Sequence, residues 1–492
     1  MAALGQEEVR PYFLSYEITQ LRNFSASASF GALRSSNETT QRTLDIDLRV
    51  GDHELDNTRR AGDSGRSPFR NFRRLQIPVE DDPDSIRSIL WVETDRHYRR
   101  AVQQLTQVRM DVQVKVQAED PSPDFSREPA SSVVEDEEPI SVDPGEWELK
   151  VRRYSAPFAE HGDIYHGSAS LNAETETRWF ANSEGSRIRT SATTYRLVVS
   201  ANTKADDGME LPLHKTYLSF TPEGVPDDDI VDRDVRRMIE ILLALRDAPL
   251  VDPYTGPAIL SGQASGVFFH EILGHRLEGH RLKDADDSHT FREQLNQKVL
   301  PESFSVHFDP TRRPLKPTTS RGQLPLPQSG IAVHRVTVID EGIPRNFLMS
   351  RSSLAGFPNS NGHRRKQPGM RPVARHSYLI VEVADPLASD ELKARFPAAI
   401  KAEDKPFGLR FDAFEGGLTF TGRFLPNVFN VTPLLVYRIY PDGRQELVRG
   451  VDLIGTPLTT LSRIVAADNQ IDVFNGHCSA ESGSVPVADF WS

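Results

Sequence analysis

Residues 266–280 read Gly266-Val-Phe-Phe-His270-Glu271-Ile-Leu-Gly274-His275-Arg-Leu-Glu278-Gly-His280 and form the most informative stretch of this 492-residue chain. The apolar lead-in predicts a buried helix that presents two imidazoles and a carboxylate together. A glutamate directly after the first of two nearby histidines is typical of metal hydrolases, where the histidines bind the ion and the glutamate is the general base. The stretch therefore predicts a metal-dependent hydrolase site.

The spacing of the two histidines constrains the shape of this helix. His270 and His275 stand five residues apart, whereas the common zinc-protease signature places them four apart. On a regular α-helix a five-residue step separates two side chains by roughly 140°, which is too far for them to share one ion. A π-type turn would bring them together, and so would a break of the helix at Gly274. The alternative is a structural helix in which Glu271 pairs with Arg276 or Arg281.

A third metal ligand has to come from outside this pair, because hydrolytic zinc normally takes three protein ligands and keeps one position for water. The candidates lie shortly after the motif or near the end of the chain: His280, Asp284, Asp286, His289, His477 and Cys478. Thiolate is a soft ligand that suits zinc, and a bound thiol is deprotonated. Cys478 is therefore the favoured third ligand.

Composition limits the classes of partner. The chain carries 58 Lys and Arg against 70 Asp and Glu, a formal net charge of -12, which works against nonspecific nucleic-acid binding. No apolar run approaches the length of a bilayer span, so no membrane partner is expected. Residues 1–8 lack the basic and apolar regions of a secretory signal, which predicts a cytoplasmic protein, although an exported mature form would look the same. Cys478 is the single cysteine, so an intramolecular disulfide is excluded.

The first 250 residues combine alternating segments with two amphipathic patterns. Alternation predicts short strands at 12–18, 25–30, 43–50, 177–180 and 194–200. Apolar residues at three- and four-residue steps predict a long helix after Pro83 and a second helix after Pro226. An acidic, Pro-rich stretch at about 118–145 predicts an exposed loop. Prolines at 249, 253 and 257 place a domain boundary near residue 250.

Beyond residue 250 the pattern is mostly that of strands, at 331–339, 378–383, 418–422, 434–440 and 445–448. Pro441-Asp-Gly443 lies between the last two and is a strong hairpin signal. Such connections favour an antiparallel sheet that curls toward a barrel. We therefore predict an α+β fold of two domains. Residues 1–250 would form an N-terminal sheet-and-helix domain, and residues 251–492 a mainly antiparallel, barrel-like catalytic domain that carries the metal-binding helix.

The motif resembles a known family. Residues 270–279 are similar to the His-Glu-x-x-Gly-His-x-Leu-Glu-Gly pattern of TldD/PmbA metalloproteases, including the five-residue spacing. Three further segments agree with that family: Gly256-Pro-Ala-Ile-Leu with Ser265-Gly, the Ser360-Asn-Gly-His-Arg-Arg365 loop, and Cys478 followed by Gly483 and Val485-Pro-Val487. The resemblance covers most of the C-terminal half and points to the TldD-like subunit with an intact metal site. One departure is His280, where family members often carry aspartate.

The resemblance implies that zinc is bound by His270, His275 and Cys478, with Glu271 as general base for a zinc-activated water. Glu278 would orient one of the ligand histidines, the alternative being a purely structural carboxylate. The resemblance also implies a homodimer, or a heterodimer with a TldE/PmbA-like subunit. Such assemblies enclose the active sites and restrict entry to unfolded peptides.

These inferences predict a zinc-dependent metallopeptidase that hydrolyses unfolded or flexible peptides. Two alternatives stay open, a noncatalytic peptide-binding partner subunit and a metal-dependent amidase acting on a small molecule. No motif assigns the substrate-binding residues. Arg364 or Arg365 could pair with a substrate carboxylate, or both could belong to an ordinary basic turn.

Overall fold

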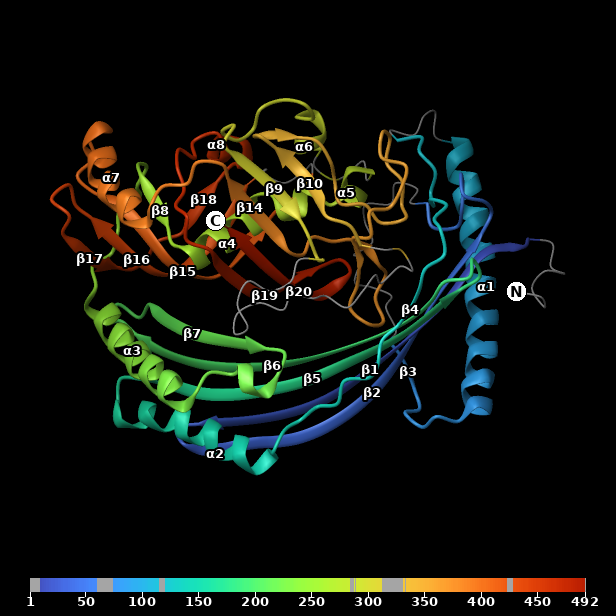
Figure 1. Ribbon diagram of the computed structural model, residues 1–492, viewed down its shortest axis with the longest axis horizontal. Helices are drawn as coiled ribbons and strands as arrows, with labels where there is room; N and C mark the ends of the chain where they lie inside the picture. Colours follow the sequence, from blue (N-terminus) through green and yellow to red (C-terminus); the bar gives the residue numbers. More distant parts are fainter. Residues whose placement is uncertain are drawn as a thin grey trace.

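The computed structural model describes residues 9–59, 74–114, 120–283, 287, 289–311, 331, 333–422 and 428–491. Its N-terminal part is a seven-stranded sheet in the order β3-β2-β1-β5-β6-β4, with β7 beside β6. The strands are β1 (Pro11–Ser29), β2 (Ala32–Val50), β3 (Leu75–Ile77), β4 (Ser132–Val134), β5 (His166–Asn182), β6 (Arg187–Lys204) and β7 (Glu210–Ser219). Four of these strands are long, and the sheet they form curves beneath the C-terminal half (Figure 1).

The first hairpin is longer than the sequence predicts. The two segments predicted at 12–18 and 25–30 are one continuous strand, β1, which pairs with β2 along almost its whole length. Its turn lies at Phe30 and Gly31, both with positive φ (50° and 80°), which is the backbone that matches the twist of a two-residue hairpin. The short strands predicted within β5 and β6 are confirmed as parts of longer ones.

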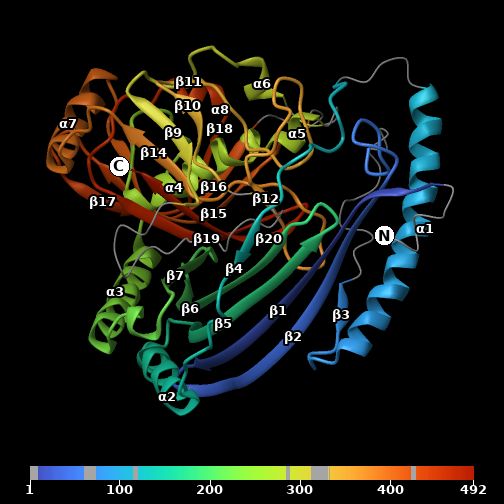
Figure 2. The ribbon, with the colours of Figure 1, turned by 45° about the vertical axis from the view of Figure 1, so that its right-hand side comes forward.

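Three helices cover the N-terminal sheet: α1 (Pro83–Val114), α2 (Pro144–Ser155) and α3 (Asp228–Asp247). The short 3-10 helix η2 (Ala156–Glu160) follows α2, and η3 (Pro222–Gly224) precedes α3. The predicted helices after Pro83 and Pro226 are thus confirmed. α2 and α3 pack on one face of β1, β5 and β6, whereas α1 stands at the opposite end of the sheet (Figure 2).

The acidic segment is less exposed than predicted. Asp124 and Phe125 are buried, Asp124 forms an ion pair with Arg59 (2.8 Å), and β4 adds to the sheet beside β6. The prediction of an exposed loop is therefore wrong for Asp124 and Phe125, whereas the acidic run at residues 136–139 is exposed. The physical reason is that the carboxylate has a guanidinium partner and the aromatic ring packs against Phe13.

The C-terminal half contains two open sheets and a small hairpin. One sheet has the order β11-β10-β9-β14-β20-β19, the other β17-β16-β15-β8 with β18 beside β16, and β12 pairs with β13. The strands are β8 (Ala258–Leu260), β9 (Phe304–Phe308), β10 (Val336–Asp340), β11 (Ile343–Pro344), β12 (Arg364–Arg365), β13 (Val373–Ala374), β14 (Leu379–Val383), β15 (Gly408–Thr419), β16 (Phe429–Ile439), β17 (Gln445–Val448), β18 (Leu453–Gly455), β19 (Asp472–Ala480) and β20 (Gly483–Trp491).

Most of these pairs are antiparallel, as predicted, with β14·β20 and β15·β8 parallel. The barrel-like shape is not confirmed, because both sheets are open paths and the described strands close no barrel. The hairpin at Pro441–Gly443 is confirmed by the pairing of β16 with β17. The strand predicted at 331–339 is shorter and begins at Val336. The boundary near residue 250 stays a prediction.

The motif helix lies at the centre of this half. The helices are α4 (Gly262–Ile272), the 3-10 helix η4 (Gly274–Leu277), α5 (Gly279–Lys283), α6 (Thr290–Glu293), α7 (Ser389–Ala402) and α8 (Pro457–Leu461). α4 contacts strands of both sheets, and its apolar side chains belong to the largest buried cluster of the C-terminal half. The motif is therefore held rigidly from two sides.

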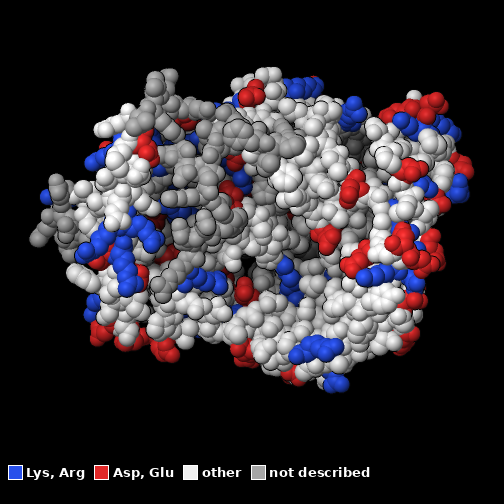
Figure 3. All heavy atoms as spheres, turned by 180° about the vertical axis from the view of Figure 1, so that it is seen from behind, with Lys and Arg blue, Asp and Glu red and all other residues white. Residues whose placement is uncertain are grey.

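Two surface properties bear on partners. In the described part of the chain, no helix combines the length and the apolar character needed to cross a membrane. On the face shown in Figure 3, acidic and basic side chains are interspersed and no broad basic area is visible among the residues drawn in colour.

Candidate metal centre

The five-residue spacing of the two histidines is resolved by a break in the helix. α4 ends at Ile272 with His270 in its last turn, and the chain continues as the 3-10 helix η4, which carries His275. No π-type turn is involved. The two imidazole rings lie 5.5 Å apart between centroids, so both face the same space. Of the two geometries predicted from the spacing, the structure has the break near Gly274.

Gly274 has a second role, which is to admit another imidazole. A Cβ atom at this position would lie 2.9 Å from both Cδ2 and Nε2 of His376, closer than carbon and nitrogen atoms pack. His376 precedes β14 and was not among the sequence candidates. The glycine of the motif is thus required for the close approach of a third histidine.

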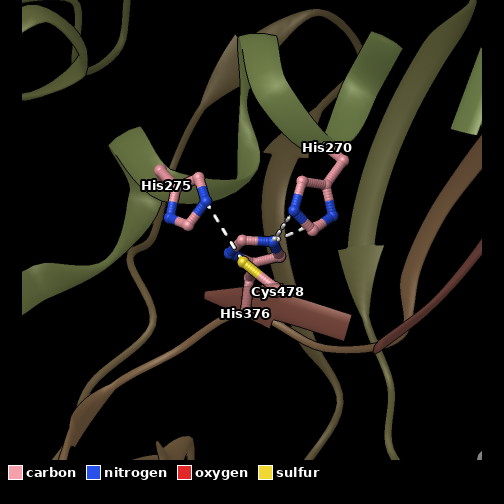
Figure 4. A group of neighbouring side chains, drawn as sticks. All are labelled: His270, His275, His376 and Cys478. Atoms are coloured by element: carbon pink, nitrogen blue, oxygen red, sulfur yellow. Dashed lines mark hydrogen bonds between the residues drawn. The ribbon is translucent and has the colours of Figure 1, made fainter. Parts of the chain in front are cut away.

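Four side chains converge at this point (Figure 4). The donor atoms of His270, His275, His376 and Cys478 all lie within 4.8 Å of one another, and all four side chains are buried. His376 Nε2 lies 3.2 Å from His270 Nε2, and Cys478 Sγ lies 3.2 Å from His275 Nε2. The three predicted ligands are therefore brought together, and His376 joins them.

Carboxylates hold the far side of each ring. Asp489 Oδ2 lies 2.8 Å from Nδ1 of His270, and the two oxygens of Glu278 lie 3.4 Å from Nδ1 of His275 and 2.9 Å from Nδ1 of His376. This arrangement fixes the orientation of each imidazole. It leaves Nε2 of His275 and His376 to face the centre, whereas both ring nitrogens of His270 lie within 3.2 Å of His376 Nε2. Metal-binding histidines are usually held in this way.

Glu278 is the most tightly held of these carboxylates. It is completely buried, and besides the two imidazoles it pairs with Nε of Arg281 (2.9 Å) and Nε of Arg375 (3.3 Å). Burial alone would raise the pKa of Glu278, but His275 and Arg281 hold it well below its usual range. Glu278 therefore stays ionised and connects the two histidines to two arginines.

Cys478 lies on β19 and is held by Arg375, whose Nη2 is 3.0 Å from its sulfur. Burial alone would raise the pKa of the thiol, but the histidines, His275 first, lower it well below its usual range. The pKa of His275 in turn is raised to about 9, because Cys478 and Glu278 outweigh the opposite effect of burial. Without an ion, a thiolate and a protonated imidazole thus stabilise each other.

Glu271 occupies a different environment. Its side chain is 6% exposed and lies against Gly417 of β15, where a Cβ atom would be 2.9 Å from its Oε1. Its carboxylate makes no hydrogen bond within the described residues, and the guanidinium of Arg276 instead binds its backbone oxygen (2.9 Å). Arg281 pairs with Glu278, and the Glu271 carboxylate acts on the Arg276 guanidinium through its charge without forming an ion pair with it. The carboxylate is available to accept a proton.

The other candidate ligands do not join the group. His280 bonds to Glu481, and Arg281 Nη2 holds the second oxygen of that carboxylate at 2.7 Å. His477 neighbours Cys478 on β19 and therefore faces the opposite side of the strand, where burial and Arg196 lower its pKa to about 4. His289 lies outside the cluster, and Asp284 and Asp286 lie outside the described residues.

Sequence reasoning missed His376, Arg375 and Asp489. Their local signals are weak: Arg375 and His376 directly precede a predicted strand, and Asp489 is a lone charge in the otherwise apolar run of β20. A charge inside an apolar strand does indicate a buried partner. The partner itself could not be named without the strand pairing.

Three imidazole nitrogens and one thiolate form a donor set that suits zinc. We expect zinc affinity to rise with pH through about 9, because the ion has to displace the protons of His275, whose pKa is raised to about 9, and of His270, whose pKa is raised well above its usual value. Calorimetric titration at about pH 7.5, in two buffers of different ionisation enthalpy, should show about one to two protons released per zinc. An affinity that does not change between about pH 7 and 9 would contradict this account of the cluster.

The C-terminal half of the chain is similar to known proteins. Residues 253–490 match the family model described as the PmbA/TldA metallopeptidase C-terminal domain. A protein named metalloprotease from Methanothermobacter thermautotrophicus is 25% identical over 312 residues, which cover 63% of this chain and 64% of that protein. A metalloprotease TldD homolog from Haemophilus influenzae is 26% identical over 271 residues, 53% of this chain and 52% of that protein. The matches thus span about half to two thirds of these relatives.

Solved structures share the fold over nearly the whole chain. A putative modulator of a DNA gyrase from Thermotoga maritima has a TM-score of 0.63 at 13% identity, covering 99% of this chain and 97% of that one. TldE from Thermococcus kodakarensis has a TM-score of 0.60 at 12% identity, covering 97% and 95%. The resemblance seen in the motif is confirmed, and residues 253–490 of this chain are a C-terminal domain of the PmbA/TldD metallopeptidase family.

Proposed function

We propose that this chain is a zinc-dependent peptidase acting on unfolded or flexible peptides. The observation that carries the proposal is the unpaired Glu271 carboxylate, next in sequence to a ligand of a buried cluster of three histidines and one cysteine. A hydrolase needs this combination of a metal group and a base without a fixed partner. The names of the relatives, which are metalloproteases, support the same reading.

His270, His275 and Cys478 would hold the ion, with His376 as a fourth donor at the same place. When bound, zinc acts as a Lewis acid that polarises a carbonyl and acidifies water. Four protein donors would fill its tetrahedron as in structural sites, whereas hydrolysis requires one free position. We therefore assign the ion to the three ligands predicted from the motif, and His376 would serve as an additional donor beside them.

Glu271 takes the proton of the attacking water and returns it to the leaving amine. Its position depends on Gly417, since any side chain there would push the carboxylate away. Glu278 and Asp489 keep the histidines oriented, and Arg375 holds the sulfur of Cys478. These residues act on the ligands and not on the substrate.

Two alternatives are a noncatalytic partner subunit and an amidase that acts on a small molecule. A noncatalytic partner subunit would lack metal ligands, whereas this chain has four donors in place. The likeness to TldE concerns the fold alone and does not favour that role. An amidase acting on a small molecule would use the same chemistry, so substrate tests separate the two. A second copy of the chain or a TldE/PmbA-like subunit remains the proposed partner.

We expect Glu271→Gln to keep its metal and to lower the rate of peptide cleavage by about 100-fold to 10,000-fold, the usual contribution of a general base. Cleavage of a random peptide library, followed by mass spectrometry, measures the loss. Glu415→Gln is the matched control, because Glu415 lies exposed on β15 near Gly417 and should leave the rate unchanged. Full activity of Glu271→Gln would refute its role as base.

The ligand assignment predicts about one zinc ion per chain in the wild type. The variant Cys478→Ala should lose most of its bound zinc after dialysis against a weak chelator. His376→Ala should keep the ion with an affinity about ten times lower, as expected for a donor that is not essential. Metal analysis of the dialysed proteins gives the answer. Undiminished zinc in Cys478→Ala would remove it from the ligand set, and complete loss in His376→Ala would make His376 an obligatory ligand.

A further inference from the structure

Three consecutive cations at β12 are buried, but they are not equivalent. Arg364 pairs with Asp47 of β2 at 3.3 Å. Lys366 pairs with Glu17 of β1 at 3.0 Å and also with Asp45 of β2. Both cations therefore point toward the N-terminal sheet, which supplies a carboxylate for each of them.

Arg365 lies between them and points the other way, as alternate residues of a strand do. Its Nη1 lies 3.5 Å from the backbone oxygen of His376, a long contact, and its Nη2 has no hydrogen-bond partner. No carboxylate among the described residues lies within ion-pair distance of it. Its charged neighbours include the cations Arg375 and Arg178 and, with the opposite sign, the thiolate of Cys478; burial and then Arg375 lower the pKa of Arg365 to about 9.

A buried guanidinium without an anion is costly, by several kcal/mol on the usual scale for buried charges. A buried charge of this kind is a candidate for binding a ligand of opposite charge. Arg365 is 5% exposed, the same fraction as His270 and close to the 6% of Glu271. Arg365 Nη1 lies 3.5 Å from the backbone oxygen of His376, whose ring belongs to the metal group, so the positive charge of Arg365 stands beside that group.

We propose that Arg365 binds the C-terminal carboxylate of the peptide substrate, so that the chain removes residues from the C-terminal end. This inference rests on the proposed peptidase function. A planar guanidinium pairs with a carboxylate through two parallel hydrogen bonds, which Nη2 and a second nitrogen can supply. In each cycle the C–N bond near the terminus breaks, the hydroxyl of water joins the acyl carbon, and its proton goes to the released amine.

The first test compares matched peptides that end in a free carboxylate or in an amide. We expect kcat/KM of the zinc-loaded wild type to be about 30 times higher for the acid, the range of a hydrogen-bonded charge pair. Arg365→Gln should bring the ratio near one by slowing the acid only, with zinc content unchanged. Arg364→Gln is the control and should keep the ratio, because Arg364 faces Asp47. If Arg365→Gln does not fold, Arg365→Lys should show a reduced ratio.

Three results would overturn the proposal. The wild type could cleave acid and amide equally, or Arg365→Gln and Arg365→Lys could both keep the wild-type ratio. The third result comes from comparing cleavage of amide-capped peptides that contain Glu with those that contain Gln. Faster cleavage of the Glu peptides that depends on Arg365 would assign the subsite to an acidic side chain instead of a terminus.

A binding measurement separates this proposal from the proposed function. Zinc-loaded Glu271→Gln should bind the acid peptide about 30 times more tightly than the amide, and the added change Arg365→Gln should abolish the difference. If the wild type cleaves no peptide but this difference is present, the peptidase function fails and the carboxylate subsite stands. If peptides are cleaved and the difference is absent, the subsite fails and the peptidase function stands.

Discussion

The buried carboxylate of Glu278 is the interaction on which the site depends. It is completely buried and reaches His275, His376, Arg281 and Arg375 at once. It orients the imidazoles of His275 and His376, two proposed metal donors, and through Arg375 it is linked to the sulfur of Cys478. A single anion thus links three segments far apart in the sequence. Its removal would leave several buried cations unpaired, which is costlier than losing one bond.

Local backbone geometry provides the second constraint. The end of α4 at Ile272 and the turn of η4 convert an unfavourable five-residue spacing into a shared donor space. Gly274 makes room for the third imidazole, and Gly417 makes room for the base. The motif and strand β15 therefore act as one unit. Beside that unit, Arg365 contributes a positive charge that forms no ion pair with a carboxylate of the described residues, and its Nη2 has no hydrogen-bond partner.

Sequence reasoning reached the parts of the site that local spacing encodes. His270, Glu271, His275 and Glu278 follow from the motif, and the choice of Cys478 followed from thiolate chemistry together with the family resemblance. His376 and Asp489 could not be inferred, because they reach the site through pairing of β14 with β20, where Leu379 stands opposite Asp489. The long helices were predictable from their apolar period. The full length of β1 was not, since it contains buried polar residues such as Thr19 and Gln20, the latter bonded to Arg42 at 2.6 Å.

The proposed zinc site combines histidine nitrogens with the sulfur of Cys478. X-ray absorption at the zinc edge of the loaded protein tests it most directly, because sulfur and nitrogen scatterers differ in distance. We expect one sulfur at about 2.3 Å with two or three nitrogens at about 2.0 to 2.1 Å, and loss of the sulfur shell in Cys478→Ala. A wild-type spectrum with nitrogen and oxygen scatterers alone would contradict it.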